Sequence, residues 1–278
     1  MDFQGLKVVV DCAHGAAYKV SPKVLRELGA KVWVIGDKPD GTNINAGCGA
    51  VYPARLQGAV REYKADVGIA HDGDADRAIF VDERGQLVDG DHAMAALALD
   101  MHSRGELKKN TVVGTVMSNF GLEQALAKSG IKLVRTAVGD RYLLEAMMAG
   151  GYNFGGEQSG HLIFLDHNTT GDGLISGLQI LSLMKRSGRS LSDLAGCMKP
   201  VPQILLNIAV KEKPDLGALP GFQQALRKGE AKLDGRGRVL VRYSGTEPLL
   251  RIMVEGDGEA LIRSVAEDLA VVVRARLG

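Results

Sequence analysis

Residues 67–81, VGIAHDGDADRAIFV, join two short apolar runs through an acidic loop. The first run, VGIA, ends at His71 and has the composition of a buried strand. The second run opens a hairpin, AIFVDERGQLV, whose turn we predict at residues 83–85. An acidic loop directly after a buried strand is the feature around which the rest of the chain can be ordered.

The elements before this stretch alternate in type. Ser21 followed by Pro22 marks a helix start, since the hydroxyl can cap the helix and proline suits its first position. In chain order we predict a strand at 7–11 (KVVVD), a helix ending at Leu28 before Gly29, a strand at 31–36 (KVWVIG), a Gly/Asn-rich loop at 40–49, and a helix at 53–63. This alternation is typical of βαβ units on a largely parallel sheet.

A second unit with the same order of elements follows the hairpin. We predict helices beginning at Asp91, at Asn119 and after Asp140, a helix at 173–187, and strands at 111–117, 132–136, 153–155 and 161–165. After a linker, MKPVPQ, come strands at 204–210, 238–242 and 249–256 and helices at 219–228 and 260–276. The predicted fold is two related α/β domains with mixed, largely parallel sheets, at residues 1–88 and 89–199, and a small α+β domain at 200–278.

Composition excludes several classes of protein. The 278 residues are 45% hydrophobic and 24% charged, with 34 basic and 33 acidic side chains, so charge gives no reason to expect nucleic acid or a membrane as partner. Cys12, Cys48 and Cys197 form no CxxC pair, which argues against a zinc site or a disulfide framework and favours a reducing compartment. No apolar run approaches the ~18 residues of a membrane span, and we expect a cytoplasmic protein.

The acidic loop has the pattern of a cation site. Asp72, Asp74 and Asp76 alternate, so an extended loop would point their carboxylates the same way. Carboxylates brought together repel one another, and a hard cation such as Mg²⁺ would relieve that repulsion with oxygen ligands. Gly73 allows a tight bend, and Arg77 offers a two-pronged guanidinium to a phosphate near the metal.

Three other interpretations of the acidic loop remain open. An EF-hand would have glycine where Arg77 stands, and a strand follows where that loop should continue. An aspartyl phosphatase is conceivable because aspartate forms phosphoenzymes, but Asp76 stands where the dehalogenase-like signature has Thr or Val. The plainest alternative is a solvated acidic turn.

A glycine-rich loop, GGEQSGH at residues 155–161, lies between two predicted strands. Its glycines let backbone approach a ligand closely, and Glu157 and Ser159 can bind the hydroxyls of a polar ligand. His161 is a candidate for proton transfer near neutral pH. The alternative is a glycine-rich hairpin with incidental polar residues.

The stretch RYSGTEP, which begins at Arg242, has the composition of an anion site. The guanidinium can grip a phosphate with two hydrogen bonds, and the hydroxyls of Ser244 and Thr246 with the backbone around Gly245 can complete the nest. Arg251 lies nearby on the next predicted strand. The alternative is a polar β-turn, and the spacing of a Walker loop is absent.

In this order the three loops resemble the α-D-phosphohexomutase superfamily, with its DGDxDR metal loop, GExSGH sugar loop and R-x-S-[GN]-T-E-P phosphate loop. The resemblance covers essentially the whole chain. Within the superfamily it is nearest to the phosphoglucosamine mutase branch, through GEQSGH, SGTEP, NINAGCGA at 43–50 and VGDRY at 138–142. The family's folds imply two α/β domains and a small domain like the TATA-binding protein.

The resemblance implies a role for each loop residue. It assigns Asp72, Asp74 and Asp76 to Mg²⁺, Arg77 to the phosphoserine, Glu157 and Ser159 to sugar hydroxyls, His161 to proton transfer, and Arg242, Ser244, Gly245, Thr246 and Arg251 to the non-reacting phosphate. The implied reaction interconverts glucosamine 6-phosphate and glucosamine 1-phosphate through a phosphoserine and a glucosamine 1,6-bisphosphate. That reaction serves amino-sugar nucleotide and peptidoglycan precursor synthesis.

Two departures from the family pattern matter. Ala75 stands where many members have glycine, so a positive φ there would strain the loop. The S-H-N-P motif of the phosphoserine domain is absent, so we expect a C-terminal fragment that lacks this domain and is inactive alone. A different hexose-phosphate mutase, such as a phosphomannomutase or phosphoglucomutase, and a non-catalytic phosphosugar-binding protein stay as alternatives.

Overall fold

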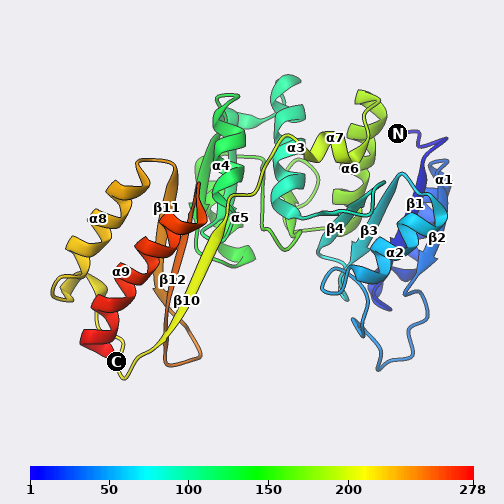
Figure 1. Cartoon of the computed structure of the whole chain (residues 1–278). Helices are drawn as coiled ribbons and strands as arrows, with labels where there is room; N and C mark the ends of the chain where they lie inside the picture. The colour runs from blue at the N-terminus through cyan, green and yellow to red at the C-terminus, as the bar shows by residue number, and fades with distance from the viewer. The chain divides into compact units, whose positions relative to one another are not determined.

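The computed structural model describes residues 1–278, which form two compact units. The first unit comprises residues 1–118 and 122–199, and the second comprises residues 119–121 and 200–278. Figure 1 shows helices packed on sheets in both units, and the two sheets of unit 1 are mixed, which confirms the predicted α/β class. The domain boundaries at 88/89 and 199/200 stay a prediction. None of the helices combines the length and apolar character needed to cross a bilayer.

The first sheet of unit 1 has the strand order β2-β1-β3-β4-β5. Its strands are β1 (Lys7–Asp11), β2 (Lys31–Ile35), β3 (Val67–His71), β4 (Ala78–Asp82) and β5 (Leu87–Val88). The first three are parallel, and β4 runs antiparallel to β3 with His71 opposite Ala78. The acidic loop is therefore the connection between two central, fully buried strands.

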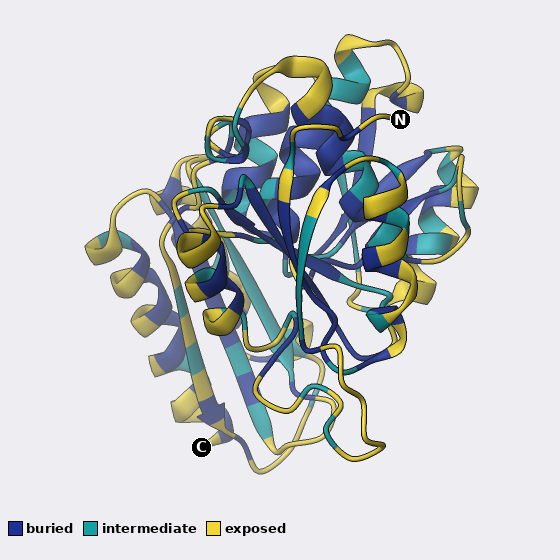
Figure 2. Cartoon of the chain, turned by 90° about the vertical axis from the view of Figure 1, so that its right-hand side faces the viewer, coloured by how far each residue is buried: buried dark blue, intermediate teal, exposed yellow.

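Alternation along β1 divides the core on the two faces of this sheet. Val8 and Val10 belong to one buried cluster, and Val9 belongs to another with Leu56 and Val60 of α2 (Ala54–Tyr63), because successive side chains of a strand point to opposite faces. Helix α1 (Val20–Glu27) precedes β2. Figure 2 shows the central strands buried and the connecting loops exposed.

The second sheet of unit 1 has the order β7-β6-β8-β9. Its strands are β6 (Thr111–Thr115), β7 (Lys132–Thr136), β8 (Phe154–Gly156) and β9 (Leu162–Phe164), and its helices are α3 (Gly90–Ser103), α4 (Phe120–Ala127), α5 (Asp140–Gly150), α6 (Gly173–Ser187) and α7 (Leu191–Ala195). Apolar residues of α3 and α6 share one buried cluster with both sheets. That shared core holds the acidic loop and the GGEQSGH loop in one unit.

Unit 2 is built on a three-stranded antiparallel sheet of order β10-β12-β11. It contains β10 (Gln203–Ala209), β11 (Gly237–Tyr243), β12 (Leu249–Gly256), α8 (Phe222–Leu233) and α9 (Glu259–Leu277). Short 3₁₀ turns lie at Ala16–Tyr18, Lys108–Asn110 and Leu216–Ala218.

The helix predicted at 219–228 is displaced towards the C-terminus. A 3₁₀ turn and Gly221, with a φ of 81°, delay its start to Phe222, and it continues past Gly229. A Cβ on Gly229 would lie 2.8 Å from Val265 Cγ1, so this glycine allows α8 to pack closely on α9. Glycine was therefore needed for close packing here and did not end the helix.

Candidate functional site

The acidic loop brings three carboxylates together at the end of β3. One oxygen from each of Asp72, Asp74 and Asp76 lies within 4.8 Å of the other two. The backbone of the loop is held in place by a hydrogen bond that the Gly73 carbonyl accepts from the Ala16 amide at 2.8 Å. A cluster of hard oxygen donors with this spacing fits a divalent cation such as Mg²⁺.

Ala75 is held in the left-handed region of backbone conformation, with a φ of 65°. Its amide donates to the Asp72 carbonyl at 3.2 Å, and its carbonyl accepts from the Gly173 amide at 2.9 Å. Many members of the family have glycine at this position, and the structure shows that the φ here is positive. Alanine pays for this conformation with strain that glycine would avoid.

Arg77 neutralises two of the carboxylates. Its Nε lies 2.8 Å from Asp72 Oδ2 and 3.2 Å from Asp76 Oδ1, and its backbone amide donates to Asp72 Oδ1 at 3.1 Å. A guanidinium in this position offsets the repulsion of the loop. Facing a phosphoserine, the role implied by the family, remains a prediction for this residue.

Asp72 and Asp76 differ in their protonation. Burial, followed by a hydrogen bond with Asp76, raises the pKa of Asp72 to about 7. Burial also opposes ionisation of Asp76, but the hydrogen bond with Asp72 and the neighbouring His161 and Arg77 lower the pKa of that carboxyl below its usual range. Near pH 7 Asp72 is therefore only partly ionised, and a cation that binds it would compete with its proton.

The GGEQSGH loop lies beside the acidic loop. The Gly160 carbonyl accepts a hydrogen bond from Ala78 at the start of β4, at 3.1 Å. The Gln158 carbonyl accepts from Gly90 at 3.0 Å, and the Gln158 side chain donates to Asp89 at 3.2 Å. The loop is thus anchored to the first sheet and to the start of α3.

Glu157 and Ser159 stand together at this loop. Glu157 Oε1 accepts from the Gly139 amide at 3.1 Å, and its Oε2 accepts from the Ser159 hydroxyl at 3.3 Å. Ser159 is exposed and Glu157 is half-buried, so both can reach a ligand. The hydrogen bond from Gly139 shows that the VGDRY stretch supports the GGEQSGH loop. The sequence did not reveal this contact.

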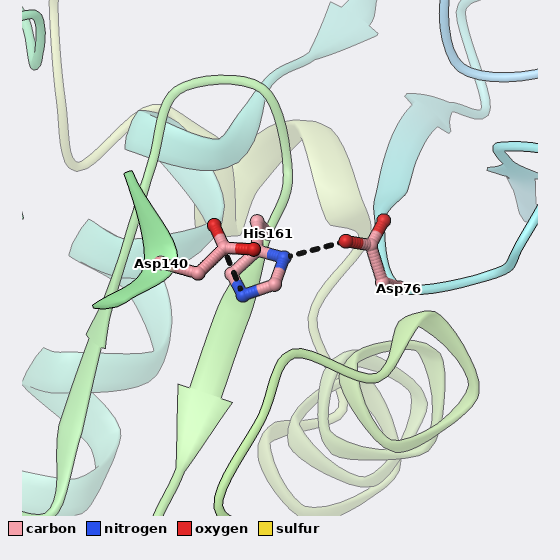
Figure 3. Close-up of side chains that lie close together, drawn as sticks. All are labelled: Asp76, Asp140 and His161. Atoms are coloured by element: carbon pink, nitrogen blue, oxygen red, sulfur yellow. Dashed lines mark hydrogen bonds and ion pairs between the residues drawn. The ribbon is translucent and has the colours of Figure 1, made fainter. Parts of the chain in front are cut away.

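His161 is buried between two aspartates, with 2% of its side chain exposed (Figure 3). Its Nδ1 lies 3.1 Å from Asp76 Oδ2, and its Nε2 lies 3.5 Å from Asp140 Oδ1. Because the Gly171 amide donates to Nε2 at 3.2 Å, Nε2 is an acceptor and the ring proton sits on Nδ1, where it is donated to Asp76. Proton transfer to substrate by His161 remains a prediction, and a proton leaving the ring would first meet Asp76.

The same geometry argues against a second cation site at this histidine. Asp76, Asp140 and His161 are close enough to share an ion. In the tautomer assigned above, however, Nδ1 carries the proton and the Nε2 lone pair accepts from Gly171, so neither nitrogen is available as a ligand. The acidic loop is therefore the better candidate cation site.

A cavity of about 360 Å³ borders the acidic loop. Its polar lining comes from Ser21, Asp74, Asp76, Thr170 and Asp172. A cavity with convergent polar groups at its wall is the usual form of a site for a small polar ligand.

A buried pair behind the loop escaped the sequence analysis. His71 Nε2 lies 2.8 Å from the Ser21 hydroxyl, and both residues are buried. Burial lowers the pKa of His71 to about 4, so the ring is neutral at physiological pH. The pair ties the end of β3 to α1 and thereby fixes the base of the acidic loop.

In unit 2 the RYSGTEP loop gathers positive charge. Arg242 on β11 and Arg251 on β12 are direct cross-strand partners, an arrangement of like charges that an anion would stabilise. The Lys213 ammonium donates to the Ser244 carbonyl at 2.6 Å. Glu247 neutralises part of this positive charge, because its Oε2 accepts a hydrogen bond from Arg251 at 2.7 Å.

Within this loop the predicted ligands are not equivalent. Ser244 is buried, and its hydroxyl interacts with the Glu247 carboxylate at 3.3 Å and with Arg251 at 3.4 Å. Gly245 and Thr246 are exposed. Ser244 therefore shapes the loop, whereas the other two are open to a phosphate. Lys213 and Glu247 are the members of the site that the sequence analysis missed.

Comparison with known proteins gives the same family for all three segments of the chain. Models for phosphoglucomutase/phosphomannomutase match as α/β/α domain II at residues 2–85, α/β/α domain III at 89–201 and the C-terminal domain at 205–272.

The curated relatives share this assignment. Phosphoglucosamine mutases of Syntrophotalea carbinolica and Geobacter metallireducens are each 57% identical to the chain over its full 278 residues. The chain spans 61% of the length of the first and 62% of the second.

Solved structures agree on the fold. A Burkholderia thailandensis phosphoglucomutase/phosphomannomutase family protein matches with a TM-score of 0.78 and 22% identity, over 97% of this chain and 60% of that one. The Aspergillus fumigatus N-acetylphosphoglucosamine mutase, solved with GlcNAc-6P and magnesium, matches with a TM-score of 0.71 and 23% identity, over 98% of this chain and 62% of that one.

We expect Ala75→Gly to raise the free energy of unfolding by up to about 1.6 kcal/mol. The left-handed conformation costs an L-residue about 1–2 kcal/mol, and the greater freedom of glycine in the unfolded chain cancels about 0.4–1 kcal/mol of the gain. Ala149→Gly, on the exposed side of α5, is the matched control and should lower stability by about 0.5–1 kcal/mol. Urea unfolding measures both, and equal destabilisation by the two changes would contradict the strain.

We expect His92→Gln to remove a pH-dependent stabilisation behind the sugar loop. A hydrogen bond to Asp89 at 2.6 Å raises the pKa of His92. A raised pKa stabilises the fold below the unfolded value of about 6.5, and that contribution is lost as the pH rises through the folded pKa. The substitution should therefore cost about 1 kcal/mol at pH 6 and less at pH 9.

Denaturant unfolding at the two pH values checks this, with His102→Gln in the same helix as control. The control should leave the pH dependence in place. A cost for His92→Gln that is equal at pH 6 and pH 9 would show that the charge of the pair does not contribute.

We expect Arg242→Ala to weaken phosphate binding by about tenfold or more, since a hydrogen bond to a charged group contributes about 1.5–3 kcal/mol. Ser244→Ala should weaken it a few-fold, and Arg242→Lys should restore binding only in part. Chemical-shift titration of the chain with inorganic phosphate and with glucosamine 6-phosphate measures this. Arg263→Ala, at an exposed ion pair on α9, is the control. Shifts that miss residues 242–246 would mean that the loop is only a turn.

Proposed function

Because the chain belongs to the phosphoglucomutase/phosphomannomutase family, we propose that it is the metal-, sugar- and phosphate-binding part of a phosphoglucosamine mutase. The observation that carries the proposal is the contact between the acidic loop and the GGEQSGH loop, where His161 Nδ1 lies 3.1 Å from Asp76 Oδ2. Transfer of a phosphoryl group to a sugar requires hydroxyl-binding groups at the edge of a cation site, and this contact supplies that juxtaposition.

The choice of glucosamine rests on the relatives. Proteins that are 57% identical over the whole chain carry the name phosphoglucosamine mutase. We therefore propose glucosamine 6-phosphate and glucosamine 1-phosphate as substrate and product of the whole enzyme. Glu157 and Ser159 would bind the sugar hydroxyls, and Arg242, Thr246, the Gly245 backbone and Arg251 would hold the phosphate that does not react, with Ser244 supporting that loop.

Mg²⁺ is the cation that we propose for Asp72, Asp74 and Asp76. The donors are all carboxylate oxygens, which suit a hard divalent ion, and such an ion would compete with the proton on Asp72, whose pKa is about 7. When bound, Mg²⁺ would neutralise negative charge on the group in transfer. Arg77, freed from one carboxylate, would then be able to turn towards a phosphate.

The reaction that we propose conserves phosphate. The O–P bond of a phosphoserine breaks as its phosphoryl group passes to the free hydroxyl of glucosamine 6-phosphate or 1-phosphate. That hydroxyl loses a proton, and the released serine oxygen takes one up. The resulting glucosamine 1,6-bisphosphate reorients, and the O–P bond of its other phosphoryl group breaks as that group passes to the serine. The serine hydroxyl then loses a proton, and the sugar oxygen takes one up. These 278 residues contain no S-H-N-P sequence, so in this proposal the serine is supplied by a domain that they do not include.

The proposed setting is the cytoplasm, in the supply of amino-sugar precursors for peptidoglycan. The three cysteines are free thiols, as expected in a reducing compartment.

A fusion experiment tests the function. The part of the Syntrophotalea carbinolica phosphoglucosamine mutase that the chain does not match is joined ahead of residue 1, and interconversion of glucosamine phosphates is assayed for the chain alone and for the fusion. We expect turnover only in the fusion, with glucosamine 6-phosphate preferred over glucose and mannose 6-phosphates. Asp74→Asn in the fusion controls for activity of the added part. A folded fusion without turnover, or turnover by the chain alone, would overturn the proposal.

We expect the chain alone to bind Mg²⁺ with roughly millimolar affinity, about 4 kcal/mol. Arg77 and the proton on Asp72 both compete with the ion for the same carboxylates. Asp74→Asn should weaken binding about tenfold further, since it removes one charge and one ligand. Asp193→Asn, at an exposed position of α7, should have no effect. Calorimetric titration giving micromolar affinity that Asp74→Asn leaves unchanged would refute this site.

A further inference from the structure

The turn Gly171–Asp172–Gly173, between β9 and α6, contacts the acidic loop and His161 at the same time. The Gly171 amide donates to His161 Nε2 at 3.2 Å, and the Gly173 amide donates to the Ala75 carbonyl at 2.9 Å. Asp172 caps α6, because its Oδ1 accepts from Ile175 at 2.9 Å. The backbone amides on either side of this capping residue thus bond to the acidic loop at Ala75 and to His161 beside it.

Both glycines are required by space and not by backbone conformation. Neither has a positive φ. A Cβ on Gly171 would lie 2.4 Å from Cε1 of the His161 ring. A Cβ on Gly173 would lie 2.3 Å from the Arg77 carbonyl oxygen and 2.6 Å from His71 Nδ1. The Asp172 side chain alone is enough to cap the helix. Capping therefore does not explain why Gly171 and Gly173 lie so close to the His161 ring and the Arg77 carbonyl.

The two hydrogen bonds act on neighbouring residues of the acidic loop. The bond from Gly173 holds Ala75 in its left-handed conformation. The bond from Gly171 makes Nε2 of His161 an acceptor, so that Nδ1 carries the proton and donates it to Asp76. One turn therefore fixes both the backbone of the acidic loop at Ala75 and, through His161, the side chain of Asp76.

The turn itself is firmly supported. Helix α6 begins at Gly173 and buries Ile180 and Leu181 in the core that the two sheets share. A displacement of the turn would have to move a buried helix, which makes it a rigid reference for the exposed loop.

We propose that the Gly171–Gly173 turn is a positioning element that sets the spacing of the Asp72, Asp74 and Asp76 carboxylates for a divalent cation. The inference rests on the proposed function, since it assumes that the acidic loop binds such an ion. The residues of this turn lie outside the three loops, and they act on the cation site through the Ala75 carbonyl and the His161 ring.

The test compares glycine substitutions in the 278-residue chain. In Gly171→Ala the added methyl group would clash with the His161 side chain, and in Gly173→Ala it would clash with the Arg77 backbone carbonyl. Both should weaken Mn²⁺ binding tenfold or more, measured by electron paramagnetic resonance of the free ion. Gly177→Ala is the matched control, because Gly177 lies one turn further along α6 and its Cβ would meet Ile69 at 3.1 Å. It should perturb the same core and leave Mn²⁺ affinity unchanged.

A second readout needs no metal. Long-range ¹H–¹⁵N spectra of the wild-type imidazoles should show His161 protonated at Nδ1, and Gly171→Ala should shift it towards the other tautomer. Protonation of the wild-type ring at Nε2, or Mn²⁺ affinity unchanged in both glycine variants, would overturn the positioning role.

Absence of Mn²⁺ binding by the wild-type chain at millimolar concentration would overturn the metal site of the proposed function, and the positioning role with it. Wild-type Mn²⁺ binding that both glycine variants retain would overturn the positioning role alone. A His161 ring that keeps its proton on Nδ1 in folded Gly171→Ala would likewise overturn the action of the turn through His161.

Discussion

Three carboxylates within 4.8 Å of one another repel, and unit 1 is arranged around that repulsion. Arg77 pairs with Asp72 and Asp76, the raised pKa of Asp72 reduces its negative charge near pH 7, and His161 donates to Asp76. Each of these interactions uses a carboxylate oxygen that a cation would need. These partners therefore limit the repulsion in the loop without an ion, and the proposed cation would compete with them for the same oxygens.

Short-range features of this arrangement were predictable from the sequence. Alternation in DGDADR predicted that Asp72, Asp74 and Asp76 would converge, and the structure brings them together. The strands before and after the loop were predicted from their apolar runs, because both faces of a central strand are buried. The order of helices and strands then followed from the alternation of strand-like and helix-like segments. The prediction that Ser21 caps a helix was wrong, because Ser21 lies inside α1 and its hydroxyl contacts His71.

What the sequence could not show depends on residues far apart in the chain. His161 meets Asp76 across 85 positions, and Ser21 meets His71 across 50. Gly173 was predicted only as the start of a helix, since a close approach to the Arg77 carbonyl leaves no local pattern. Ser244 looked like a phosphate ligand because its hydroxyl lies in a polar loop, and only the tertiary structure shows that it is buried against Glu247 and Arg251.

The two candidate sites differ in charge. Around the RYSGTEP loop Arg242 lies opposite Arg251, Lys213 donates to the Ser244 carbonyl and Glu247 accepts from Arg251, so the proposed phosphate site has cations of its own. The acidic loop repels a phosphate until a cation reverses its charge. In the proposed reaction the two phosphate groups of a bisphosphate would have different roles: the arginines would hold one, and the other would be attracted only where a metal is bound. Interchange of the two groups would therefore require release from the arginines.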